Sequence, residues 1–70
     1  MNSEVIGLWA GSVWSVLNEA DALGMKQLKK ISKLKEKEIY AAIGWLAREG
    51  KIVINENPDD EKDYIFSLVR

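Results

Sequence analysis

The chain has 70 residues, 47% hydrophobic and 30% charged, which is the composition of one small folded domain near the lower size limit for a self-sufficient core. It has no cysteine and no histidine, which excludes disulfides, a thiol nucleophile, an imidazole base and the usual zinc ligands, so we expect no enzyme activity and no cofactor. The net charge of −1 conceals a lysine-rich block at residues 26–37, with a sum of +5, and an acidic block at residues 55–63, with a sum of −4.

The first predicted element is a helix from about Glu4 to about Ala20, with Ser3 as its N-cap and Gly24 marking the stop that follows it. The apolar stretch within it is too short to span a bilayer and follows Glu4 rather than a basic residue. We therefore predict a cytoplasmic protein without membrane contact and without a small-molecule substrate. The apolar residues that recur at helical spacing are Ile6, Trp9, Ala10, Val13, Leu17 and Ala20.

Two further helices are predicted in the centre of the chain. Leu28, Ile31 and Leu34 recur at three-residue spacing with lysines between them, which indicates a short helix. The chain turns near Leu34, and Glu36 and Glu38 then lie in the first turn of a third helix, where they complement the helix dipole. Gly50 is expected to end this helix in the left-handed conformation. Its predicted buried stripe is Ile39, Ala42, Ile43 and Leu46.

After Gly50 the pattern changes to two β-rich segments, residues 51–54 and 64–69, joined by a charged loop at residues 55–63. They predict a β-hairpin, and a one- or two-residue strand at Met25 would make the sheet three-stranded. Three helices followed by a C-terminal hairpin form a winged helix-turn-helix, a mainly α fold with a small antiparallel β wing. We predict a single domain of this kind over residues 1–70.

Two stretches of the sequence resemble a known family. Residues 10–14 are Ala-Gly-Ser-Val-Trp, similar to an "AG-x-[IV]-W" motif, and residues 44–52 contain the motif "GWLARE-x-KI". With these motifs, residues 6–54 resemble the bacterial winged helix-turn-helix domain family of unknown function. The resemblance implies DNA binding as the default for such a fold and protein interaction as a frequent departure.

The leading functional hypothesis is a nucleic-acid-binding, transcription-regulator-like module with duplex DNA as its partner. Lysines of the second helix are candidates for phosphate contacts, namely Lys26, Lys29, Lys30 and Lys33. The side of the third helix opposite Ile39 is expected to face the groove, with Lys37, Tyr40, Ala41, Gly44 and Arg48. Few of these side chains read bases, and solvation is the alternative role of the lysines.

The competing hypothesis is a module for protein interaction or homodimerisation that does not bind DNA. Tryptophan and tyrosine are enriched at interface hot spots, and glycines at helical spacing leave shallow notches beside them. We expect Trp9 in the core and Trp14 and Trp45 half-buried, with core packing as their other role. The candidate interaction surface is Trp14, Tyr40, Gly44 and Trp45.

The carboxylates offer no catalytic or metal site. Glu36 and Glu38 are predicted on different sides of a helix start, so they do not form an acid–base pair. The acidic segment at residues 55–63 lacks the ligand alternation and the central glycine of a calcium loop. Its carboxylates are expected to keep a hairpin tip solvated and to prevent edge-to-edge pairing of strands. Weak cation binding at this segment is the alternative, and it would not amount to a function.

Overall fold

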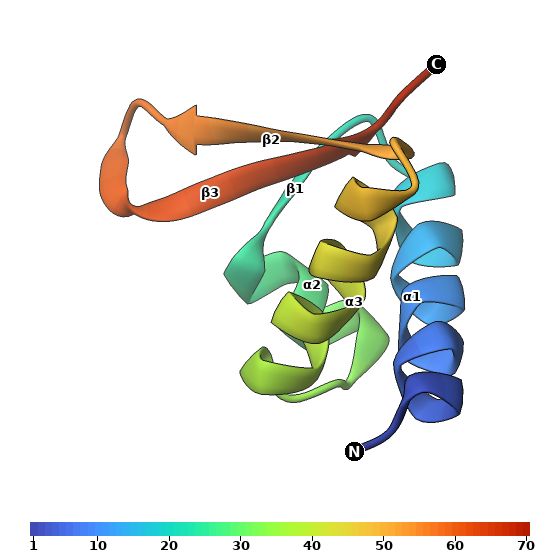
Figure 1. Ribbon diagram of the computed structural model, residues 1–70. Helices are drawn as coiled ribbons and strands as arrows, with labels where there is room; N and C mark the ends of the chain where they lie inside the picture. Colours follow the sequence, from blue (N-terminus) through green and yellow to red (C-terminus); the bar gives the residue numbers. More distant parts are fainter.

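The computed structural model describes residues 1–70 and places three helices beside a small antiparallel sheet (Figure 1). The elements in chain order are α1 (Ser3–Asn18), β1 (Leu23–Gly24), α2 (Met25–Ser32), α3 (Glu36–Arg48), β2 (Ile52–Asn57) and β3 (Asp60–Leu68). The helices gather on one side of the molecule, and the hairpin of β2 and β3 extends away from them. The predicted order of three helices followed by a C-terminal hairpin is confirmed.

The limits of α1 differ from those predicted. Asn2, not Ser3, is the N-cap, because its side-chain oxygen accepts a hydrogen bond from the Val5 N–H at 2.9 Å. The helix ends at Asn18, two residues before the predicted Ala20. Gly24 does not mark the end of this helix, since it lies in β1 and immediately precedes α2.

The second helix buries Met25 and Leu28, whereas the predicted Ile31 is 55% exposed. Each step of three residues falls about 60° short of a full turn, so a three-residue repeat drifts around the helix and Ile31 leaves the buried side. Leu34 lies beyond the end of the helix and is partly buried against the core. The predicted stripe of α2 was therefore wrong at Ile31.

The third helix agrees closely with its prediction. Its four buried residues are the predicted Ile39, Ala42, Ile43 and Leu46. The helix ends at Arg48, and Gly50 has a φ of 70°, the left-handed conformation expected of a glycine stop. The orientation of α3 in the sequence-based prediction is thereby confirmed.

The sheet has the strand order β1-β3-β2, and both pairings are antiparallel. Its short strand is at Leu23–Gly24 rather than at Met25, which is the first residue of α2. The predicted loop at residues 55–63 is mostly strand. Asn57 and Asp60 each accept a backbone hydrogen bond two residues ahead, from the N–H groups of Asp59 and Lys62, and these bonds close the chain in a tight turn. The turn-forming residues at 55–63 therefore predicted a loop, whereas the turn itself is confined to the few residues between β2 and β3.

The core lies where the three helices and the inner face of the sheet meet, and its thirteen buried residues are all hydrophobic. The tryptophans lie at its edge. Trp9 is only partly buried against the core, so its predicted core position holds in part, while Trp14 and Trp45 are 40% and 39% exposed, half-buried as expected. A domain of this size has too little interior to enclose three indole rings.

Lys33 at the end of α2 provides a test of local backbone strain. Its φ is 64°, and it is the only non-glycine residue of the chain with a positive φ. The left-handed conformation costs a residue with a side chain roughly 1–2 kcal/mol, and glycine avoids this cost. The greater entropy of glycine in the unfolded chain offsets part of the gain, so Lys33→Gly is expected to raise the free energy of unfolding by up to about 1 kcal/mol. Urea unfolding followed by tryptophan fluorescence measures the change. The matched control, Lys30→Gly inside the same helix, should lower stability by about 1 kcal/mol, and equal effects of the two substitutions would contradict the argument.

Candidate nucleic-acid interface

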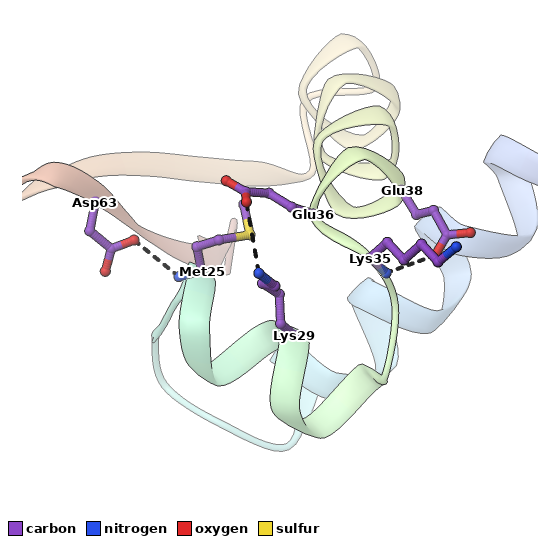
Figure 2. Close-up of polar contacts among 6 residues, drawn as sticks. All are labelled: Met25, Lys29, Lys35, Glu36, Glu38 and Asp63. Carbon is purple, nitrogen blue, oxygen red and sulfur yellow. Dashed lines mark hydrogen bonds and ion pairs between the residues drawn. The ribbon is translucent and has the colours of Figure 1, made fainter.

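The helix-turn-helix unit consists of α2, a turn at residues 33–35, and α3. The Ser32 hydroxyl donates to the Leu28 carbonyl at 2.6 Å and accepts from the Leu34 N–H at 3.2 Å, which fixes the end of α2. Lys35 is the N-cap of α3, and its N–H donates to the Glu38 carboxylate at 2.7 Å (Figure 2). These short-range bonds set the angle at which α3 leaves the turn, and they hold it with a capping arrangement that uses Glu38.

Six lysines surround this unit, and all six are exposed. One of them, Lys29, lies 3.8 Å from the Glu36 carboxylate and forms an ion pair (Figure 2). The other five have no carboxylate within ion-pair distance. We refer to this set as the lysine surface: Lys26, Lys29, Lys30, Lys33, Lys35 and Lys37. It contains the four lysines proposed for phosphate contacts, the groove-facing candidate Lys37, and Lys35, which was not among the predicted site residues.

The outer side of α3 is open to solvent along its length. Tyr40 is 46% exposed, Ala41 is half-buried, and a Cβ added at Gly44 would meet no atom within 4 Å. Lys37 and Arg48 are exposed near the two ends of the helix. The groove-facing candidates therefore share one accessible helix side, but only the two residues at its ends carry a positive charge.

A cleft of about 320 Å³ separates the helix-turn-helix unit from the hairpin. Tyr40 lies in its wall, together with three lysines and three carboxylates, so the cleft is close to electrically neutral. A phosphate group entering it would meet carboxylates as well as lysines, which weakens attraction there relative to the lysines outside it. Its charged residues are Lys26, Lys29, Lys62, Glu36, Asp60 and Asp63.

Asp63 joins the hairpin to the start of α2. Its carboxylate accepts a hydrogen bond from the Met25 N–H at 3.2 Å, at the positive end of the helix (Figure 2). A Cβ at Gly24 would lie 2.8 Å from the same carboxylate, so Gly24 leaves the space that this contact needs. The two residues are far apart in the sequence, and no local pattern marks the contact, which the sequence analysis missed.

The pKa of Tyr40 is raised above the ordinary value of 10.0. Partial burial of its hydroxyl is the first cause, and the negative charge of Glu36 is the second. Tyr64 and Asp63 contribute in the same direction. The neutral phenol is thus favoured at this position, where it is able to donate a hydrogen bond.

The four residues of the predicted interaction surface do not all line one hollow. Trp14 and Trp45 line a groove of about 360 Å³ between α1 and α3, which Gly7 and Gly11 also line. Tyr40 lies in the cleft beside the hairpin instead, and Gly44 lines neither hollow.

No helix is both long and apolar enough to cross a membrane. The carboxylates of the hairpin do not gather into a group that would hold a metal ion.

Comparison with known proteins supports the architecture. A family model described as "Winged helix-turn-helix domain (DUF2582)" matches residues 1–67. The solution NMR structure of protein BT2368 from Bacteroides thetaiotaomicron is 34% identical, with a TM-score of 0.83 over 97% of this chain and 79% of that one. A mutant MarR from E. coli, solved in complex with operator DNA, is 15% identical, with a TM-score of 0.78 over 94% of this chain and 54% of that one, and so shares the fold. No curated protein matches the chain.

A double-mutant cycle tests the contact between Asp63 and α2. Asp63→Ala removes the acceptor of the Met25 N–H and is expected to lower the free energy of unfolding by about 1 kcal/mol. Gly24→Ala should have a similar effect, because its Cβ displaces the carboxylate, and it should add little once Asp63 is already alanine. Urea unfolding of the two single variants and the double variant measures this coupling. Asp59→Ala at the hairpin tip is the control, and an equal loss there, or full additivity of the pair, would contradict the contact.

The raised pKa of Tyr40 predicts a loss of stability at alkaline pH. The pKa of Tyr40 is higher in the folded protein than in the unfolded chain. The contribution of its neutral side chain to the free energy of unfolding is therefore fully present below about pH 10, and it is lost as the pH rises through the pKa of the folded protein. Tyr40→Phe should therefore reduce the decline in stability between about pH 10 and pH 12, measured by urea unfolding across that range. An ultraviolet titration of both proteins should show that the tyrosine removed by the substitution ionises above pH 10. Identical alkaline profiles for the two proteins would refute the prediction.

Proposed function

Because this chain belongs to the family of winged helix-turn-helix domains designated DUF2582, we propose that it is a small nucleic-acid-binding module of the transcription-regulator type. Its partner is duplex DNA, and binding requires no cofactor and involves no catalysis. A cytoplasmic location is part of the proposal.

The observation that carries the proposal is the lysine surface. Five of its six lysines are exposed without an ion-pair partner, although the chain as a whole has a net charge of −1. An unpaired ammonium group that contacts a phosphate releases a condensed counterion, which favours binding. The same lysines border the turn that leads into α3, so phosphate contacts there would bring the outer side of α3 toward the groove.

The residues on α3 determine what kind of binding this would be. Arginine, lysine, asparagine and glutamine are the side chains that discriminate bases in the major groove, and the outer side of α3 offers only Lys37 and Arg48. Tyr40, Ala41 and Gly44 provide shape between them. We therefore propose binding in which phosphate contacts supply most of the affinity and base contacts supply modest selectivity.

The hairpin restricts the orientation of the duplex. Its exposed carboxylates would repel a phosphate backbone laid along it. The duplex is therefore proposed to contact the end of α2, the turn and the start of α3, with the hairpin turned away. MarR, whose fold this chain shares, is bound to operator DNA in its solved complex.

A salt titration tests the proposal. Fluorescence anisotropy with a labelled 16-base-pair duplex should show a log–log slope of about −4 against salt if roughly four phosphates are contacted. Lys30→Gln and Lys33→Gln should each reduce that slope by about 1. Lys51→Gln is the matched control, because Lys51 is exposed but lies 3.9 Å from the Glu49 carboxylate, outside the lysine surface.

The competing function, a protein-interaction module without DNA binding, gives a different result. It predicts no salt-dependent binding and no change in the backbone amide resonances of residues 26–48 when DNA is added at low salt. Either that result, or an equal loss of affinity in Lys51→Gln, would overturn the proposed DNA contact.

A further inference from the structure

The outer side of α1 is exposed and uncharged. Between Glu4 and Glu19 the chain has no charged residue, although charged residues make up 30% of the whole sequence. Leu8 is 71% exposed and Trp14 is 40% exposed on this side. A helix face that remains in water normally carries charged side chains, so this composition is typical of a surface that is covered by a protein partner.

The two glycines of α1 determine the shape of this side of the helix. The Trp45 ring lies on one side of Gly7, where an added Cβ would meet it at 3.6 Å, an ordinary van der Waals contact. Gly11 has no such neighbour, because a Cβ there would meet nothing within 4 Å. The hollow at Gly11, in the groove beside Trp14, therefore has no occupant from within the domain, and on its far side this groove is lined by Trp45, Glu49 and Lys51.

We propose that a second copy of this chain covers this side of α1, with the two helices packed antiparallel about a two-fold axis at Gly11. The contact residues recur at the spacing of a heptad stripe, which is symmetric about Gly11. Antiparallel packing therefore places Gly11 against itself, Leu8 against Trp14 of the partner copy, and Gly7 against Ser15 of the partner copy. The α1 stripe consists of Glu4, Gly7, Leu8, Gly11, Trp14, Ser15 and Asn18.

The charges at the ends of the stripe favour a second copy in this orientation. Asn18 at one end accepts a hydrogen bond from the Arg70 guanidinium at 3.3 Å, which holds that positive charge beside the stripe. Glu4 is at the other end. Antiparallel packing brings Glu4 of each copy to Arg70 of the other, whereas parallel packing would set Glu4 against Glu4.

Sedimentation equilibrium over a concentration series tests the dimer. The apparent mass should rise from the 7.9 kDa of the monomer toward twice that value. Gly11→Glu should raise the dimer dissociation constant at least about tenfold, because it sets two carboxylates against each other on the axis. Gly44→Glu is the matched control, because it adds the same side chain at another open helical glycine outside the stripe. A native chain that remains monomeric at about 1 mM, or an equal effect at Gly44, would overturn the proposal.

Cross-linking and charge reversal test the geometry. The chain has no cysteine, so Gly11→Cys should form a disulfide-linked dimer under mild oxidation much faster than Gly44→Cys. Glu4→Arg and Arg70→Glu should each weaken the dimer, and the double variant should restore it. Equal cross-linking rates, or a double variant weaker than both single ones, would overturn the antiparallel arrangement. None of the stripe residues belongs to the lysine surface, so the outcome is independent of the DNA titration.

Discussion

Burial of one side of α3 is the constraint on which the rest of the structure depends. Ile39, Ala42, Ile43 and Leu46 pack against α1 and the sheet, and each of the three larger side chains contributes about 1.5–3 kcal/mol when fully buried. In a helix of 13 residues, fixing that side also fixes the opposite one. The exposure of Tyr40, Gly44 and Arg48 is thus a consequence of the core, before any function is considered.

The same constraint places the tryptophans. A core of thirteen residues is filled by aliphatic side chains, Met25 and Phe66, so the indole rings pack around its margin. The Trp45 ring lies beside Gly7 of α1, where an added Cβ would meet it at 3.6 Å, an ordinary van der Waals contact. Gly44, one position earlier, faces away from every neighbour. Adjacent residues of α3 therefore serve different purposes, and the glycine is not needed for the packing of the tryptophan beside it.

Periodicity predicted the parts of this structure that are governed by one local rule. The α3 stripe and the left-handed Gly50 follow from helical spacing and from the freedom of glycine, so the sequence was sufficient for both. Ile31 shows the limit of the method, because a two-turn helix holds too few residues to define which side is buried. The Asp63 contact with Met25 joins residues 38 positions apart. Only the folded hairpin brings them together, and no pattern in either segment indicates the pair.

Folding brings part of the lysine-rich block next to part of the acidic block. In the sequence they are separate, yet Asp60 and Asp63 share a cleft with Lys26 and Lys29. The hairpin therefore offsets the lysines at the start of α2, while Lys30, Lys33 and Lys35 lie outside that cleft. An approaching polyanion would experience the strongest attraction at the turn between α2 and α3, away from the hairpin. The position of the acidic hairpin thus leaves the lysines of the turn as those whose positive charge is least opposed by carboxylates.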